Sequence, residues 1–279
     1  MKKLGLIAFV LLVQTSFAQV NRFVYQVTMK PDASNKNDTK TENAYLDISP
    51  EKSVFYSENR IKRDSVMKAT FQSGGARSFN REQMEGLRSN INYSVEKDKK
   101  SQKMTFKDRI GRDVYTYEED RPLNWKILSE TTKIGDYKVQ KAETDFGGRK
   151  WTAWFTTDLP YQDGPYKFGG LPGLIVKAED DKGDYSFDLM KNYKIDDFPA
   201  MNQFGNTIKV KRGDYLKQQK KFQEDPMSFM TQGGGQIRIS GGDGGPRGGG
   251  GNPPADFRKR MEERAKDEAK KNSNPIELQ

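Results

Sequence analysis

The first part of the chain has the alternating pattern of apolar positions that is typical of β-strands. From Phe23 to Met29, every second residue is large and apolar, which places these side chains on one face of a strand. Two further strands are expected around residues 45–48 and 53–56, so we predict an antiparallel meander. The next stretch is ambiguous: residues 60–71 fit a short helix, whereas 74–86, rich in glycine and charge, resembles a loop.

Strand patterns resume at Ile91 without an intervening helical period. Trp151, Ala153 and Phe155 again lie at alternate positions and predict a strand that is buried on one face. Strands this short and frequent favour an antiparallel sheet that is folded over or partly closed. We therefore predict a mainly β fold (a β-rich α+β fold), an antiparallel curved sheet or half-barrel, with one late amphipathic helix at 214–224. The strands of this series are expected at 104–106, 114–117, 125–128, 137–144, 149–157, 174–179 and 185–190, with a turn at 145–148.

The first eighteen residues have the three-part layout of a secretory signal peptide. Lys2 and Lys3 precede an apolar run from Leu4 to Val13, and small residues at Ser16 and Ala18 suit cleavage before Gln19. The run is too short for a membrane span, which needs about 20 residues. The alternative is an uncleaved anchor. We expect residues 1–18 to be removed and the protein to be exported to the periplasm or outside the cell.

The composition changes after Met230. Residues 231–254 contain eleven glycines and almost no apolar side chains, which predicts a disordered, flexible linker between a β domain over 19–230 and a tail over 255–279. The tail is rich in helix formers from Asp256 to Lys271, with only a narrow apolar stripe. It is expected to be a charged helix that is either solvated or a docking element for a partner.

The residue types that are missing exclude several kinds of chemistry. The sequence contains neither Cys nor His, so disulfides, thiol nucleophiles, imidazole metal ligands and Ser-His-Asp triads are all excluded. We expect no cofactor and no metal. The net charge of +9 comes from interleaved charges of both signs, and export argues against nucleic acid as a partner.

The segment 135–177 contains the hexapeptide Gly170-Leu171-Pro172-Gly173-Leu174-Ile175. With this hexapeptide, the segment is similar to the diagnostic segment of the GLPGLI family of exported bacterial proteins, which takes its name from it. The other matching motifs are Gly148-Arg149, Ala153-Trp154-Phe155-Thr156, Leu159-Pro160, Gly164-Pro165 and Lys167-Phe168-Gly169-Gly170. Asn274-Pro275-Ile276-Glu277-Leu278 resembles the family's usual ending. The resemblance implies an exported, β-rich protein, and it implies no reaction.

Glycines and prolines between Leu159 and Gly173 predict tight turns in a long connection that carries aromatic side chains. This connection is either an ordered loop that packs on its own aromatics or a rigid rim that accepts a partner. Arg149 could pair with Asp145 or Asp158, or present its guanidinium to an anionic ligand. The residues that we select as a candidate binding site are Arg149, Trp154, Tyr161, Tyr166, Lys167, Phe168 and Leu171.

Catalytic motifs are weak. The Ser-x-x-Lys matches at 65–68 and 49–52 lack the companion motifs of penicillin-binding enzymes, so we name no catalytic residue. The acidic turn 180–184 lacks the spacing of a calcium loop and is expected to be a solvated hairpin turn. We predict a periplasmic binding or scaffold protein, near outer-membrane machinery, that holds a peptide, lipid or protein partner on its curved sheet and GLPGLI loop. The alternative is a secreted hydrolase that uses carboxylates or a Ser/Lys pair.

Overall fold

The computed structural model describes residues 19–72, 81–201, 205–225 and 271–278, together with a few positions between 256 and 267. The expected signal peptide and the glycine-rich stretch 231–254 lie outside the described residues. The tail positions that are described between Asp256 and Lys271 are helical.

The described chain forms one twelve-stranded sheet that is not closed into a barrel. The strand order is β12-β6-β5-β4-β3-β2-β1-β11-β10-β9-β8-β7, and all neighbouring pairs are antiparallel except β12 and β6. The strands are β1 (Val20–Met29), β2 (Lys40–Ile48), β3 (Lys52–Ser57), β4 (Ser94–Asp98), β5 (Lys103–Ile110), β6 (Asp113–Glu119), β7 (Lys126–Ile134), β8 (Tyr137–Phe146), β9 (Arg149–Thr156), β10 (Leu174–Asp180), β11 (Tyr185–Ile195) and β12 (Thr207–Lys209). The helices are α1 (Glu58–Gln72), α2 (Arg81–Gly86) and α3 (Arg212–Glu224). The prediction of a mainly β fold with a late helix is confirmed.

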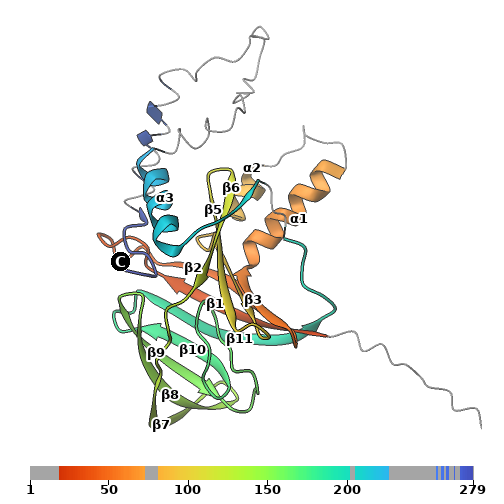
Figure 1. Ribbon diagram of the computed structural model, residues 1–279, viewed down its shortest axis with the longest axis vertical. Coiled ribbons are helices and arrows are strands. Elements are labelled where there is room, and N and C mark those ends of the chain that lie inside the picture. Colours follow the sequence, from red (N-terminus) through yellow and green to blue (C-terminus); the bar gives the residue numbers. More distant parts are fainter. Residues whose placement is uncertain are drawn as a thin grey trace, which may run out of the picture.

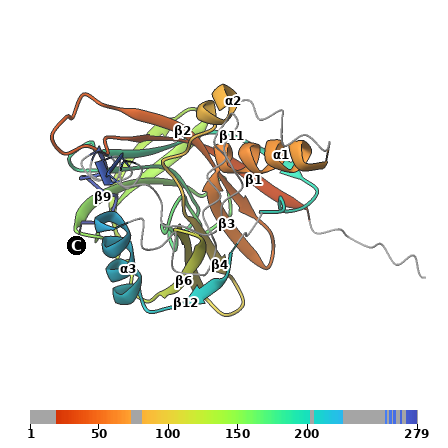
Figure 2. The same cartoon turned by 90° about the horizontal axis from the view of Figure 1, so that it is seen from above.

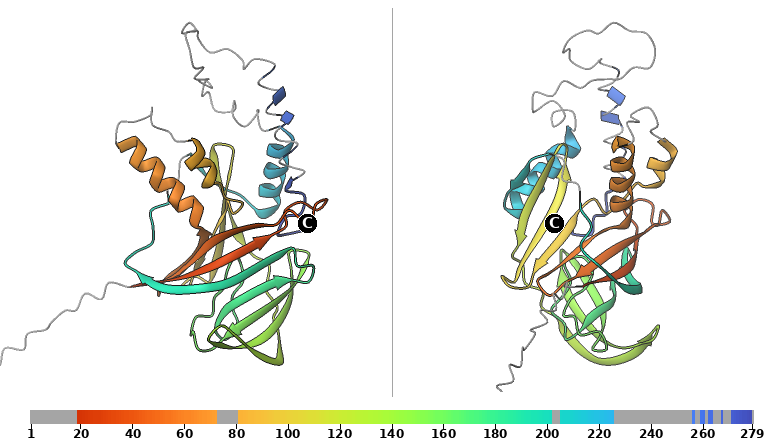
Figure 3. Two further views of the ribbon diagram at one scale, coloured as in Figure 1. Left: turned by 180° about the vertical axis from the view of Figure 1, so that it is seen from behind. Right: turned by 90° about the vertical axis from the view of Figure 1, so that its right-hand side faces the viewer.

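Two meanders build this sheet and meet in its middle. Strands β1 to β6 follow one another outward, and the chain then crosses to the far edge and returns through β7, β8, β9 and β10 to β11. Strand β11 pairs with β1 over the whole length of β1, with a bulge between Val24 and Tyr25. The second meander curls beneath the first (Figure 1; Figure 3). The sheet therefore bends around the side chains that its inner face carries.

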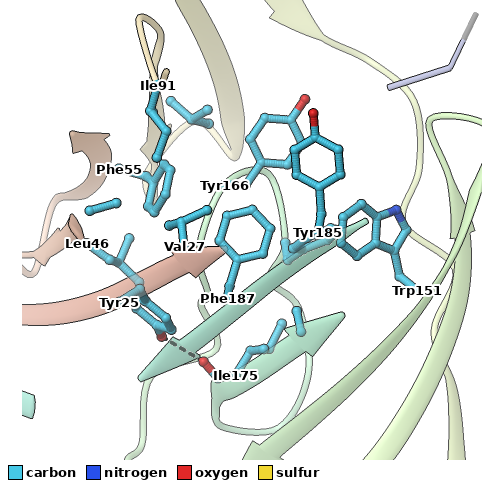
Figure 4. Packing of buried hydrophobic residues seen from close by; sticks show 14 of the residues in the cluster. Tyr25, Val27, Leu46, Phe55, Ile91, Trp151, Tyr166, Ile175, Tyr185 and Phe187 are labelled. Atoms are coloured by element: carbon cyan, nitrogen blue, oxygen red, sulfur yellow. Dashed lines mark hydrogen bonds between the residues drawn. The ribbon is translucent and has the colours of Figure 1, made fainter. Parts of the chain in front are cut away.

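The inner face is filled with aromatic and aliphatic side chains. The alternate residues predicted on β1 and β9 are buried here, among them Tyr25, Val27 and Trp151. Phe187 of β11 packs near Trp151, with ring centroids 6.2 Å apart, and near Tyr166 from the β9–β10 connection (Figure 4). Burial of side chains of this size stabilises a fold by about 2 kcal/mol each. The curve of the sheet is thus occupied by the protein's own side chains.

The opposite face of β1, β2 and β3 has a smaller cluster. Val24, Tyr45, Val54 and Tyr56 are buried there, and Ile61 of α1 packs against them. The ambiguous stretch after β3 is therefore a helix that covers apolar side chains. The expectation of a loop over 74–86 was wrong in part, because α2 forms within it.

Helix α3 packs on β5 and β6, and Tyr215 is its buried residue. Tyr215 is buried against Phe106 and Tyr117, and its hydroxyl donates to Asp108 Oδ2 at 2.7 Å. Helices α1 and α3 lie on opposite sides of β5 and β6 when the molecule is seen from above (Figure 2). Within the described residues, none of the helices has the length and apolar content to cross a membrane.

Gly173 shows why the connection between β9 and β10 needs glycine. Its φ is +147°, and a Cβ at this position would lie 2.0 Å from the carbonyl oxygen of Thr156. Gly170, three residues earlier, has φ +83° but has no heavy atom within 4 Å of the corresponding Cβ position. The two glycines share the conformational requirement, and only Gly173 has the steric one.

We expect Gly173→Ala to lower the free energy of unfolding by about 3 kcal/mol or more, because strain and overlap with the backbone add together. Gly170→Ala is the matched control, and we expect it to cost about 1 kcal/mol from conformational strain alone. Chemical denaturation of both variants measures the difference. Equal losses would show that the close approach to Thr156 has no energetic effect.

Candidate functional site

The connection between β9 and β10 turns inward rather than forming an exposed rim. Tyr166, Phe168 and Leu171 are 2%, 0% and 1% exposed, respectively, within the main core. Lys97 of β4 fixes the connection by donating from Nζ to Asp163 Oδ1 at 2.6 Å and to the carbonyl oxygens of Gly164 and Phe168. These contacts fit the alternative of an ordered loop that packs on its own aromatics.

A distant segment, Asn274–Leu278, lies against this connection. We call it the tail segment. Its main chain is held at both ends, since Asn274 N donates to the Pro31 carbonyl at 2.7 Å and Leu278 N donates to the Gly147 carbonyl at 2.6 Å. Ile276 packs against the main core. Five residues from the far end of the described chain thus complete the site.

Arg149 forms hydrogen bonds with the main chain of the tail segment. Its Nε donates to the Ile276 carbonyl at 3.0 Å, and its Nη2 donates to the Pro275 carbonyl at 2.7 Å and to Asn274 Oδ1 at 2.6 Å. The guanidinium is fully buried. Arg149 therefore forms a structural ion pair, as one of the alternatives expected, and its other nitrogens bind neutral oxygens of the protein's own tail segment rather than an anionic ligand.

The partners in that ion pair differ from the ones expected. Arg149 Nη1 lies 2.6 Å from Asp180 Oδ2 and 3.3 Å from Asp184 Oδ2, so Asp145 and Asp158 were the wrong candidates. Asp180 and Asp184 are buried, and the expectation that the whole turn 180–184 is solvated was wrong.

Asp184 has a second cation beside it. Burial alone raises the pKa of Asp184, but its contacts with Lys36, Asn274 and Arg149 outweigh burial and leave the pKa below its usual range. The acidic turn is therefore an anchor for Arg149. Within the residues that the structure describes, no group of three or more acidic side chains is arranged to hold a metal ion.

Lys167 is a fully buried ammonium group inside an aromatic cage. Its Nζ lies 4.8 Å from the ring centre of Phe106, 5.2 Å from Tyr117 and 5.3 Å from Tyr166. It donates to Tyr117 Oη at 2.9 Å, to Glu119 Oε2 at 2.6 Å and to Glu277 Oε1 at 2.5 Å. Ring faces and two carboxylates together replace the water that a buried cation loses.

Glu277 is the other half of this charge cluster. Tyr166 Oη donates to its Oε1, and Arg121 and Arg212 approach its Oε2 at 2.8 and 3.0 Å. Burial alone would raise the pKa of Glu277, but the charges and hydrogen bonds of Lys167, Tyr166 and Arg121 lower it to about 2. Glu277 is therefore held as a carboxylate, which suits recognition of an acidic side chain rather than donation of a proton.

The turn between β8 and β9 leaves no room for side chains beside the tail segment. Gly147 and Gly148 both have positive φ angles, of +62° and +76°. A Cβ on Gly147 would lie 2.8 Å from Glu277 Cγ, and one on Gly148 would lie 2.8 Å from the Leu278 carbonyl oxygen. We call the residues that hold the tail segment the tail socket: Arg121, Gly147, Gly148, Arg149, Tyr166, Lys167 and Arg212.

The structure brings together some of the residues selected from the sequence. Arg149, Tyr166 and Lys167 belong to the tail socket, and Phe168 and Leu171 lie beside it in the core. Tyr161 packs edge-on against Phe23, with ring centroids 5.3 Å apart. Trp154 lies on the half-buried face of β9, opposite Trp151 and Phe155. The binding role of these residues stays a prediction.

Sequence reasoning missed the residues that complete the charge cluster. Arg121 follows β6 and Arg212 opens α3, and neither carries a local pattern that marks it. The one available signal for Glu277 was the resemblance of 274–278 to a family ending. In the Ser-x-x-Lys match at 49–52, Ser49 Oγ accepts hydrogen bonds from the backbone amides of Glu51 and Lys52 in a turn.

Fold and site together define a β-rich protein with an open, curved sheet and a socket for an extended segment. A family model described as "Protein of unknown function (Porph_ging)" matches residues 147–177, which run from the β8–β9 turn to β10. Crystal structures of PNGF-II in space groups P21 and C2 resemble the chain with a TM-score of 0.52 and 18% identity. They cover 72% and 73% of this chain, which spans 33% of that protein, and at this identity they show the fold alone. No curated protein matches the chain.

The low pKa of Glu277 predicts how stability depends on pH. A carboxylate whose folded pKa lies below its ordinary value of 4.5 stabilises the fold above that value, and the contribution is lost as the pH falls toward 2. We expect Glu277→Gln to lower the free energy of unfolding by about 3 kcal/mol at neutral pH. The gap from wild type should shrink as the pH falls from about 5 to about 3.

Denaturant titrations across this pH range measure that gap. Glu263→Gln is the matched control, because Glu263 lies in the same tail and is exposed. We expect this control to follow the wild type throughout. A gap for Glu277→Gln that stays constant with pH would contradict the assignment.

Proposed function

We propose that this chain is an exported, periplasmic binding or scaffold protein of the GLPGLI type, working near outer-membrane machinery. Its ligand would be an extended peptide segment with an acidic side chain, held in the tail socket. The observation that carries this proposal is the way the tail segment is held, with its main chain on Arg149 and its carboxylate on Lys167.

The contacts of the socket are those that recognise peptides. Guanidinium and turn groups meet main-chain carbonyl and amide groups, and Tyr185 Oη adds a hydrogen bond of 2.7 Å to the Asn274 carbonyl. Specificity would come from one charged position, where three cations surround Glu277, and from the absence of side chains at Gly147 and Gly148. These features favour a peptide over the lipid that the sequence left open.

The filled inner face of the sheet also argues for a peptide. Tyr25, Phe168 and Phe187 occupy the curve where an acyl chain would lie. Charges at the socket are paired, and the pKa of Glu119, like that of Glu277, lies below its usual range: burial raises it, but Arg121 and Lys167 outweigh burial. Carboxylates held ionised in this way suit binding rather than proton transfer, which favours the binding function over the hydrolase alternative.

Binding of an added peptide tests this function. The probe is a labelled peptide with the sequence of residues 272–279, added to full-length protein carrying Glu277→Ala. Because this substitution removes the anchoring carboxylate of the resident segment, we expect the peptide to bind the variant roughly tenfold or more tighter than it binds wild type. Fluorescence anisotropy measures both affinities.

Two controls accompany this experiment. Glu263→Ala, in the same tail but exposed, should bind the peptide as weakly as wild type. A peptide with Ala in place of its glutamate should not bind the Glu277→Ala variant. If the native peptide also fails to bind a folded Glu277→Ala protein, the proposed function is wrong.

A further inference from the structure

We propose that the tail socket of one copy accepts the tail segment of a second copy, so that two chains pair by exchanging residues 274–278. This inference rests on the proposed function, because it names the partner of the same site. Two properties of the described residues, the length of the connecting sequence and the two-fold closure of the exchange support it.

The socket recognises the tail segment independently of the chain that leads to it. Its contacts come from residues that follow β1 and β6, from the β8–β9 turn, from the β9–β10 connection, and from the starts of β11 and α3. All of these elements precede the glycine-rich stretch in sequence. A tail segment from another copy would therefore make the same hydrogen bonds and ion pairs as the resident one, and exchange would sacrifice no contact of the socket.

An empty socket is costly, and a second copy supplies the occupant that fits it. Without Glu277, the fully buried Lys167 would retain Glu119 as its one carboxylate partner, and it would share Glu119 with Arg121. Arg212 would lose its ion pair with Glu277. Removing one partner from a buried ion pair typically costs about 3 to 5 kcal/mol. A copy whose own tail segment is displaced is thus driven to take another segment with the same charge and shape.

The connection sets the balance between a resident and an exchanged segment. The chain from Pro226 to Lys270 joins α3 to the tail segment and includes the eleven glycines of 231–254. The cost of bringing two ends of a chain together grows slowly with the length between them, and a flexible tether gives an effective concentration on the order of millimolar. Wild-type chains should therefore exchange tail segments when the protein concentration approaches this effective concentration. Exchange should need a lower protein concentration when the resident segment is disabled.

Reciprocal exchange between two copies also gives a closed assembly. Each copy offers one tail segment and one socket, so two copies related by a two-fold axis satisfy both sockets and leave no open end. The expected product is a dimer rather than a filament.

Complementary variants isolate the exchanged contact. Gly148→Asn blocks the socket, because a Cβ there would overlap the Leu278 carbonyl oxygen at 2.8 Å, while Asn tolerates the positive φ of the turn. Glu277→Ala disables the segment and leaves the socket intact. We expect each variant alone to be monomeric at micromolar concentration, and their equimolar mixture to show a heterodimer in native mass spectrometry.

A matched control places the same Gly→Asn substitution at a position where the new Cβ contacts no other residue. Gly183 has φ +62° and no heavy atom within 4 Å of its Cβ position, so Gly183→Asn retains its own segment and should form no heterodimer with Glu277→Ala. If Gly148→Asn fails to fold, Gly147→Asn replaces it, since its Cβ would lie 2.8 Å from Glu277 Cγ.

The outcomes separate the two proposals. A heterodimer in the blocked-plus-disabled mixture, absent from the control mixture, supports exchange. If the free peptide binds Glu277→Ala but the mixture stays monomeric, exchange is overturned and the proposed function stands. If neither the peptide nor the second copy binds, both proposals fail.

Discussion

Much of the structure provides neighbours for one buried cation, the ammonium group of Lys167. A charge removed from water needs counter-charges and polarisable neighbours. The counter-charges come from Glu119 at the end of β6 and from Glu277 in the tail segment, and the aromatic neighbours come from three strands and the β9–β10 connection. Elements that are far apart in sequence meet here because this single group requires them.

Lys97 and Arg149 extend this principle to the backbone. Lys97 gathers three oxygen acceptors from the β9–β10 connection, and Arg149 gathers carbonyl and carboxylate oxygens from the tail segment and the acidic turn. Both satisfy irregular backbone that a sheet cannot pair by itself. Cationic side chains thus supply hydrogen bonds to the backbone of the β9–β10 connection and the tail segment, as neighbouring strands do within the sheet.

The local part of this architecture could be predicted from the sequence. Alternation identified the strands around Phe23 to Met29 and Trp151 to Phe155, because the pleat repeats every two residues. The acidic turn was misjudged because Arg149, the cation that pairs with it, lies on the neighbouring strand β9 and 31 residues earlier in the sequence. Arg121, Arg212 and Glu277 meet only in three dimensions, and a charged residue near the end of a strand or at the start of a helix ordinarily faces water.

Pairing of β1 with β11 and docking of the tail segment also govern when the chain can fold. The first strand finds one of its two neighbours only after residue 195 has been made, and Lys167 acquires its second carboxylate only with residue 277. Contacts of such long sequence separation form slowly, and a nascent chain lacks them altogether. A growing polypeptide built in this way therefore stays incompletely folded until Glu277 has been synthesised.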